Sequence, residues 1–391
     1  MTHQTHLQRI ERYREQNRLA DKYGDNGDYA RAIKIINTQR RAAKRAGDLD
    51  YVHFFDAFLG FYRNEDADKA AERVRAGVVW LEERGMPRDS FLVCAIGVYT
   101  SLAEKYELAL DWFDKALEAD PSNWEAMRQR GVTLSYEDDH ETAIAWYDKA
   151  LAVKPDDARS LTERGLALNN LGRFDEALEW LDKSLAIEPE DSFTLRTRGE
   201  VLNSLGDWDG AVAWFDKALA INPTDAKAIG GRAEALEKMT HYDAAIEGYK
   251  KAVAVDACYV RAWIELGHLI SVYGDGDEAY ACFEKALALE PRNRWALHEY
   301  GMAHWREKDY TSALECLDKL QAVDPGYGFL HCDRGMVLRD CGDYDAAREC
   351  FRKALEATPD DYFAMYHLGG VFERQLDYDT ALEWYDKALA L

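Results

Sequence analysis

A regular proline spacing is the feature that most constrains how this chain can fold. The prolines keep one register with a period of 34 residues: Pro121, Pro155, Pro189, Pro223, Pro291, Pro325 and Pro359. Ala257 occupies the single missing place in this series. A fixed period of this length is typical of solenoid arrays, in which each repeat packs only against its neighbours. A frame that starts at Ser90 gives eight full repeats and a ninth that stops at its thirtieth residue, Leu391.

Small and large residues recur at fixed positions of this frame and predict two packed helices per repeat. Position 8 is glycine in eight of the nine repeats and Ala233 in the repeat that starts at residue 226. A small residue at this position allows the two helices to approach closely. Position 20 is alanine in all nine repeats. Position 24 is bulky in most repeats: Phe113, Tyr147, Phe215, Tyr249, Phe283, Phe351 and Tyr385. Large side chains therefore meet small ones across the packed face.

Glycine and proline also mark where the helices end. Gly172, Gly206, Gly274 and Gly342 are predicted to end the first helix of their repeats in the left-handed conformation. The proline near position 32 is predicted to stop the second helix. The repeat therefore reads as helix, tight turn, helix.

This pattern resembles the tetratricopeptide repeat family, whose 34-residue units carry the same glycine, alanine, aromatic and proline signature. The resemblance covers Ser90 to Leu391, with repeats that start at residues 90, 124, 158, 192, 226, 260, 294, 328 and 362. Upstream, residues 27–36 and 51–85 give two divergent units. We therefore expect residues 1–89 to form divergent helical hairpins with a basic surface, followed by the array at 90–391.

The resemblance implies an all-α fold: a right-handed superhelical solenoid of antiparallel helix pairs, with about eleven units. It also implies that the first helices line a concave groove that holds partner peptides. The family's carboxylate-clamp residues and its asparagine ladder are not present in this sequence, so neither of those two binding modes is expected here.

Charged residues recur at two positions of the frame. Position 7 is arginine in five repeats, where the apolar pattern predicts leucine, and position 25 is aspartate in six. Pairing each aspartate with the arginine 16 residues later gives five matches: Asp114–Arg130, Asp148–Arg164, Asp182–Arg198, Asp216–Arg232 and Asp318–Arg334.

The exceptions to this pattern favour pairing between repeats over pairing within one repeat. Where the aspartate is lost, at Lys250 and Arg352, the partner position is an uncharged leucine. Pairing within a repeat would instead place Arg232 opposite Lys250. We therefore predict inter-repeat ion pairs in which the arginine stem packs on apolar surface. The alternative is an arginine ladder for an anionic ligand.

The overall charge argues against several classes of partner. The chain has a net charge of −23, and such a surface repels nucleic acid and anionic membranes. Residues 1–48 are an exception, with 11 basic and 6 acidic residues. Their basic cluster from Arg40 to Arg45 reads as a solvated helix face or as a second partner patch. Seven cysteines, with no signal-peptide core and no apolar run long enough for a span, indicate a cytoplasmic protein.

No catalytic motif is present, so we expect no enzyme activity and no cofactor. The late histidines and their neighbours carry side chains that could bind a metal ion: His268, His298, His304, His331, His367, Glu299, Cys332 and Asp333. Their spacing matches no zinc pattern, so no metal is expected. The tryptophans at position 23 are expected to serve packing between repeats rather than docking.

The concave positions of the last three repeats are unusually rich in bulky side chains. These predicted partner-binding residues are Trp295, His298, Met302, Trp305, Phe329, Cys332, Met336, Phe363 and Tyr366. In a monomer they would form an exposed strip that suits a docked peptide or helix. The acidic surroundings favour a partner with basic and apolar residues. The alternative is that they fill the superhelix interior or are covered by an N-terminal segment or a second copy.

The sequence therefore indicates a non-catalytic scaffold or adaptor that binds a partner peptide or helix in its groove. The alternative is a regulatory or substrate-recruiting subunit whose catalytic residues lie on another chain. Two further features are expected. The repeat at 226–259, with Gly230, Gly231 and Gly248, is a soft joint, because each interior glycine costs ~1 kcal/mol relative to alanine. The last repeat has no polar outer face and leaves Asp386 unmatched, which indicates either that this chain is a fragment of a longer protein or that this end meets another molecule, such as a second copy.

Overall fold

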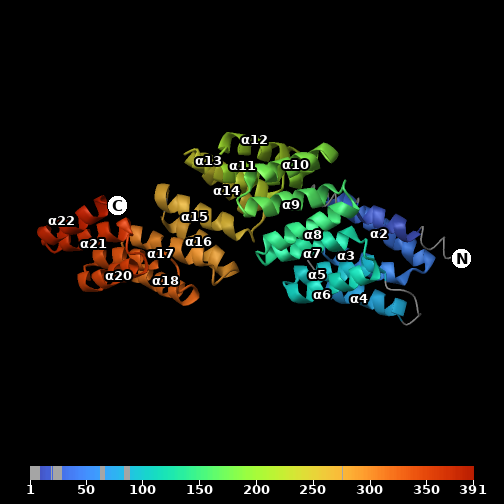
Figure 1. Ribbon diagram of the computed structural model, residues 1–391, viewed down its shortest axis with the longest axis horizontal. Helices are drawn as coiled ribbons and strands as arrows, with labels where there is room; N and C mark the ends of the chain where they lie inside the picture. The colour runs from blue at the N-terminus through green and yellow to red at the C-terminus, as the bar shows by residue number, and fades with distance from the viewer. Residues whose placement is uncertain (1–8, 19, 21–28, 62–66, 83–88, 275) are drawn as a thin grey trace. The chain divides into compact units, whose positions relative to one another are not determined.

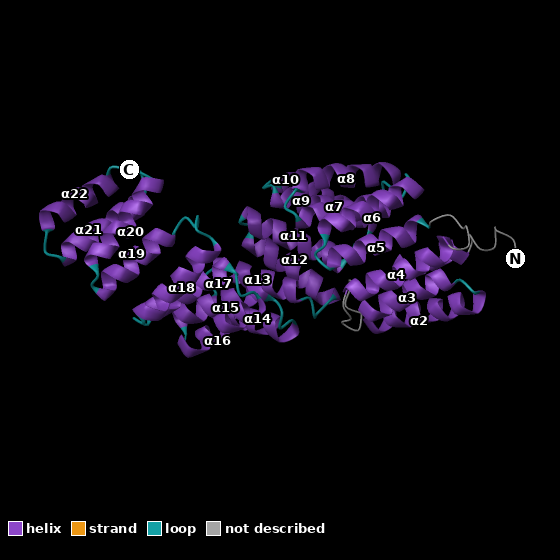
Figure 2. Ribbon diagram, turned by 90° about the horizontal axis from the view of Figure 1, so that it is seen from below, coloured by secondary structure: helices purple, strands orange, loops and turns teal. Residues whose placement is uncertain are grey.

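The computed structural model describes residues 9–18, 20, 29–61, 67–82, 89–274 and 276–391, and these residues form helices and short turns without a strand (Figures 1 and 2). An N-terminal helix covers residues 9–18. The upstream hairpins contain α2 (Tyr29–Ala46), α3 (Leu49–Phe61) and α4 (Ala67–Glu82). The turn expected near Gly27 and the residues around position 84 lie outside the described part.

The nine repeats follow as antiparallel helix pairs. Their first helices are α5 (Ser90–Leu102), α7 (Trp124–Tyr136), α9 (Ala158–Asn170), α11 (Ser192–Leu205), α13 (Ala226–Lys238), α15 (Val260–Tyr273), α17 (Arg294–Arg306), α19 (Leu330–Cys341) and α21 (Tyr362–Arg374). Their second helices are α6 (Tyr106–Ala119), α8 (His140–Val153), α10 (Phe174–Ile187), α12 (Trp208–Ile221), α14 (Tyr242–Val255), α16 (Gly276–Leu289), α18 (Tyr310–Val323), α20 (Tyr344–Ala357) and α22 (Tyr378–Leu389).

The predicted frame gives the first residue of eight of the nine first helices. The exception is α19, which begins at Leu330 rather than at residue 328. Gly326 and Gly328 precede it, and glycine loses more conformational freedom than any other residue when it enters a helix. Most first helices begin after an Asp or Asn whose side chain accepts a backbone N–H of the first turn, as Asp157 does from Ser160.

One turn position adopts the left-handed conformation in eight of the nine repeats. Gly172, Gly206 and Gly342 have φ values of 73°, 86° and 94°, as predicted. The same position also has positive φ where no glycine is present: Glu104, Asp138, Thr240, Lys308 and Leu376. The prediction for Gly274 is wrong, because this residue has φ −133°. The turn therefore requires the conformation irrespective of the residue, and glycine only makes it less strained.

The glycine at position 8 permits close packing inside each repeat. A Cβ atom built on Gly131 would lie 2.6 Å from Cε1 of Tyr147, the position-24 residue of the same repeat. Gly97 and Phe113 have the same relation. The alanine at position 20 is buried in every repeat, so the ring at position 24 packs between two small residues.

The five predicted ion pairs are present, and each joins consecutive repeats. Arg164 Nε lies 2.7 Å from Asp148 Oδ1, and Arg232 Nε lies 2.7 Å from Asp216 Oδ1. The other three pairs are Asp114–Arg130, Asp182–Arg198 and Asp318–Arg334. The arginine that replaces a leucine is therefore paired across the interface between repeats.

Three of the five tryptophans at position 23 contact the arginine of their own repeat. The Arg164 guanidinium lies 4.0 Å from the ring centroid of Trp180, and Arg130 and Arg198 lie over Trp146 and Trp214 in the same way. Each of these arginines is therefore bound by an aspartate of the preceding repeat and by a ring of its own repeat. These tryptophans therefore contribute to the packing between repeats through their contact with the arginines.

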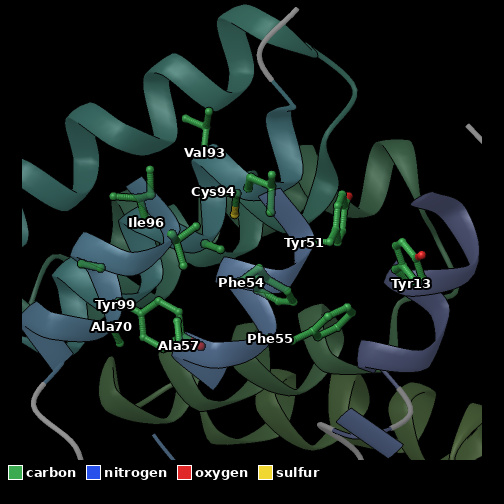
Figure 3. Close-up of a cluster of buried hydrophobic side chains, with 14 of the residues drawn as sticks. Tyr13, Tyr51, Phe54, Phe55, Ala57, Ala70, Val93, Cys94, Ile96 and Tyr99 are labelled. Atoms are coloured by element: carbon green, nitrogen blue, oxygen red, sulfur yellow. The ribbon is translucent and has the colours of Figure 1, made fainter. Parts of the chain in front are cut away.

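The upstream helices share a core with the first repeats. Tyr51, Phe54 and Phe55 of α3 are buried beside Val93 and Ile96 of α5 (Figure 3). The basic cluster of α2 lies largely in solvent: Arg41, Lys44 and Arg45 are exposed, and Arg40 forms an ion pair with Asp56 of α3. Most charges of this cluster therefore lie on a solvent-exposed helix face, as the first of the two interpretations predicts.

The chain divides into two compact units, Met1–Thr240 and His241–Leu391. The division falls inside the repeat at 226–259, between its helices α13 and α14. It differs from the expected boundary at residue 90, which rested on the repeat register rather than on compactness. Below, the two parts are called the N-terminal unit and the C-terminal unit. Among the described residues, no helix is both long and apolar enough to cross a bilayer.

Candidate partner-binding surface

Four of the predicted groove residues are exposed aromatic side chains on the first helices of the C-terminal unit or at their start. Trp295 of α17, Phe329 at the start of α19, and Phe363 and Tyr366 of α21 are 52%, 64%, 36% and 57% exposed. Trp295, Phe329 and Phe363 all occupy position 2, so consecutive repeats present them side by side. These four residues are called the aromatic strip. Exposed rings at a repeated position are typical of surfaces that bind another molecule.

Three of the predicted groove residues outside this strip are buried. Met302 and Met336 are buried in a core cluster with Phe351 and Leu368. Cys332 is buried against Ala354 and Ala364. The expectation that these side chains are exposed is wrong, because the helices of the next repeat cover them. They support the surface from below.

Trp305 also differs from the expectation. It is half-buried, packs against two core clusters, and its Nε1–H donates to Asp340 Oδ2 at 3.1 Å. This bond connects α17 to α19. Trp305 is therefore first a packing residue, and its substitution would disturb two repeats.

Ionisable side chains joined by hydrogen bonds connect three consecutive first helices of the C-terminal unit. Glu299 contacts His268 at 2.7 Å and His298 at 3.0 Å through its two carboxylate oxygens. His298 Nε2 lies 3.1 Å from Asp333 Oδ2. These contacts therefore link α15, α17 and α19. We call these four residues the histidine–carboxylate chain.

The hydrogen bonds of the histidine–carboxylate chain favour the charged forms of His268, His298 and Glu299. Burial opposes the charge on His298, but its hydrogen bonds to the carboxylates of Asp333 and Glu299 raise its pKa to about 9. The hydrogen bond to Glu299 raises the pKa of His268. Burial opposes ionisation of Glu299 as well, but the two histidines hold its pKa well below the usual range.

The other late histidines are in different environments. Burial and the nearby Arg339 lower the pKa of His367 to about 4, and its Nδ1 lies 2.9 Å from that guanidinium. Burial lowers the pKa of His304 and of His331. Among the described residues, no group of three or more His, Cys, Asp or Glu side chains has an arrangement that could hold a metal ion.

Tyr327 is a member of the surface that the sequence analysis missed. Its ring contacts Trp295, Phe329 and the imidazole of His298, with centroid separations of 5.9, 6.2 and 5.4 Å. Tyr327 precedes the repeat start at residue 328, so it lies outside the first-helix positions from which the groove was predicted. The aromatic run from Tyr327 to Phe329 was the available signal.

The N-terminal unit contains a second concave feature. A cavity of about 670 Å³ is lined by the first helices α5, α7 and α9 and by Asn17 and Arg18 of the N-terminal helix. Its charged side chains are largely paired with one another: Arg18 with Glu125, Arg128 with Asp157, and Arg159 with Glu163. This cavity is therefore a mixed-charge groove, with the N-terminal helix at its edge.

The last helix leaves a partly apolar face uncovered. Leu382 and Leu389 of α22 are exposed, whereas the equivalent Ile144 and Leu151 of α8 are nearly buried. Asp386 has no arginine partner among the described residues, in contrast to the five paired aspartates. Self-association through this face remains a prediction.

These observations define the class of protein: an α-solenoid of helix–turn–helix repeats with an aromatic surface on consecutive first helices. Tetratricopeptide repeat models match residues 103–157, 156–223, 273–327 and 332–391. The chain belongs to the tetratricopeptide repeat family.

Solved structures share the fold at low sequence identity. The human IFIT1 dimer with m7Gppp-AAAA is 18% identical, with a TM-score of 0.62; the match covers 96% of this chain and 89% of that chain. The hetero-tetramer Cut9–Hcn1 of APC/C contains a chain that is 15% identical, with a TM-score of 0.53 and coverage of 97% and 87%. At this identity the likeness shows the fold alone. No curated protein matches the sequence.

Proposed function

We propose that this protein is a non-catalytic interaction scaffold that binds a partner peptide or helix on the concave side of its C-terminal unit. The observation that carries the proposal is the aromatic strip. Three consecutive repeats expose a large ring at the same position, and rings of this kind act as anchors in protein interfaces. A strip that serves only packing would be expected to be covered.

The charges around the strip support a partner with basic as well as apolar residues. Asp361, the N-cap of α21, places a carboxylate two residues before Phe363 of the strip. Opposite charges across an interface steer association and select the partner. The net charge of −23 disfavours nucleic acid and anionic membranes as the main partners. Seven free cysteines support a cytoplasmic location.

The test is affinity capture with an exposed-surface variant. Trp295→Ala with Phe329→Ala removes two anchors whose side chains are mostly in solvent, so the fold should be retained. We expect captured partners to be lost or weakened at least tenfold. Tyr378→Ala with Leu382→Ala, two exposed residues of α22 outside the strip, is the matched control.

The captured partners also separate the two functional alternatives. An enzyme recovered in constant ratio would favour a regulatory or substrate-recruiting subunit, and non-enzymatic partners would favour an adaptor. Full capture by the strip variant, with unchanged helicity and melting temperature, would contradict binding at this surface.

A further inference from the structure

An arginine of the N-terminal helix binds a carboxylate and an aromatic ring at the start of a first helix. Arg14 Nη2 lies 2.7 Å from Asp89 Oδ1, and its guanidinium lies 5.5 Å from the ring centroid of Phe91. Asp89 is the N-cap of α5, and Phe91 is its position-2 residue. Figure 3 shows Tyr13 of the same helix directed toward Tyr51, 5.2 Å away between ring centroids. The arrangement therefore consists of a cap carboxylate and a ring two residues later.

Other first helices of the N-terminal unit also hold an arginine at the cap carboxylate. Arg196 Nε lies 3.2 Å from Asp225, the N-cap of α13. Arg128 Nε lies 3.8 Å from Asp157, the N-cap of α9. Both arginines occupy position 5 of the preceding repeat. A guanidinium at this carboxylate is therefore a recurring feature of the array.

The same arrangement recurs in the C-terminal unit without its arginine. Asp361 is the N-cap of α21, and its Oδ1 accepts the N–H groups of Phe363 and Ala364 at 2.9 and 3.1 Å. Position 5 of the preceding repeat is Cys332, and its thiol lies 3.6 Å from Asp361 Oδ2. No cation among the described residues lies within ion-pair distance of this carboxylate.

The ring beside Asp361 is accessible. Phe363 is 36% exposed, and one edge of it contacts His367 at a centroid separation of 4.2 Å. His367 is uncharged near neutral pH because its pKa is lowered to about 4, so it does not repel a cation there. A guanidinium can hydrogen bond to a carboxylate and stack on a ring at the same time, which an ammonium group does less well.

We propose that Asp361 and Phe363 form an arginine-binding site, and that the partner places an arginine there beside apolar residues on Phe329 and Trp295. This inference rests on the proposed function, and it names the residue that the partner carries. First helices of adjacent repeats are ~10 Å apart, so about three residues of an extended peptide separate neighbouring contacts. The ligand is therefore a segment with one arginine and apolar side chains at such intervals.

The site can be tested directly with a small probe. The full chain is labelled with 4-fluorophenylalanine, and the ¹⁹F resonances of Phe91 and Phe363 are assigned by Phe→Leu substitutions. Nα-acetyl-arginine amide is then titrated, with the citrulline compound as its uncharged isostere. We expect a saturable shift at Phe363 and at least tenfold weaker binding of citrulline.

Two variants make the titration decisive. Asp361→Asn keeps the helix cap, because asparagine caps as well as aspartate does, and should reduce arginine binding to the citrulline level. Arg14→Gln opens the Asp89–Phe91 site, so Phe91 should then respond to arginine and serve as the positive control. Melting curves establish that both variants are folded.

The outcomes separate this inference from the proposed function. Absence of a saturable shift at Phe363, at concentrations that titrate Phe91 in Arg14→Gln, would overturn the arginine site. If the Trp295→Ala, Phe329→Ala variant still loses its partners, the docking surface stands without it. A shift at Phe363 that arginine and citrulline produce equally would also overturn the inference.

Discussion

At the scale of single residues, the main finding is that backbone geometry is repeated more strictly than the sequence. The turn position is glycine in only four repeats, yet eight of the nine repeats have positive φ there. Non-glycine residues in the left-handed conformation cost about 1–2 kcal/mol. Five repeats therefore carry local strain that the packing of the two helices overcomes.

This strain gives a direct prediction at Leu376, which has φ 65° and is 72% exposed. Leu376→Gly should stabilise the C-terminal unit by about 1 kcal/mol, because relief of strain outweighs the small loss of buried area. Urea denaturation followed by circular dichroism measures the change. Gly342→Ala, at the same position of the preceding repeat, should destabilise by a similar amount. A destabilised Leu376→Gly variant would show that the turn is not strained.

At the scale of elements, the same contacts recur between successive repeats of the chain and hold them together. Each of five arginines is bound to the preceding repeat, and three of them also stack on a tryptophan of their own repeat. Sequence covariation within the repeats was enough to predict the pairs, because a lost aspartate coincides with a lost arginine.

A double-mutant cycle on Asp148→Ala and Arg164→Ala should give a coupling energy of about 0.2–1 kcal/mol, since the aspartate is half-exposed. The same cycle on Asp182 and Arg164, which lie in one repeat, should give a coupling near zero. Equal couplings in the two cycles would mean that the ion pairs do not set the register between repeats.

The histidine–carboxylate chain predicts a pH dependence of the C-terminal unit. The pKa of His298 is about 9 in the folded state and near 6.5 when unfolded. A group whose pKa is raised by folding stabilises the fold below its unfolded pKa, and this stabilisation disappears as pH rises through the folded value. Stability should therefore fall between pH 6.5 and 9, by on the order of 3 kcal/mol.

The check is a series of urea denaturation curves from pH 6 to 9.5. His298→Gln should flatten most of the slope, whereas His331→Gln, which lies outside the chain of hydrogen bonds, should leave it in place. A slope that is the same in the two variants would place its origin in other groups.

At the scale of the whole molecule, the sequence predicted the repeated architecture well and the surface only in part. Period, caps and small–large pairs are local properties that recur, so they fix the helix frame in all repeats except the glycine-rich start of α19. Burial depends on how neighbouring repeats cover a position. For this reason Met302, Met336 and Cys332 were wrongly expected at the surface, and Tyr327 was missed.

The division at residues 240 and 241 lies in the repeat whose glycines indicate a soft joint. We expect amide hydrogen exchange in α13 and α14 to be at least tenfold faster than in α11 and α16. Gly230→Ala with Gly248→Ala should reduce the difference, because each replacement favours the helix by ~1 kcal/mol. Uniform protection across these four helices would contradict a joint.

We propose that the aromatic strip is the partner-binding surface. Amide hydrogen exchange of a complex is the most direct test of this proposal. Hydrogen exchange of the full chain should be compared with and without a captured partner. We expect slower amide exchange in α17, α19 and α21 when the partner is bound. The effect should be strongest in the turns before Trp295, Phe329 and Phe363. Protection confined to the N-terminal unit or to α22, with the strip unchanged, would contradict it.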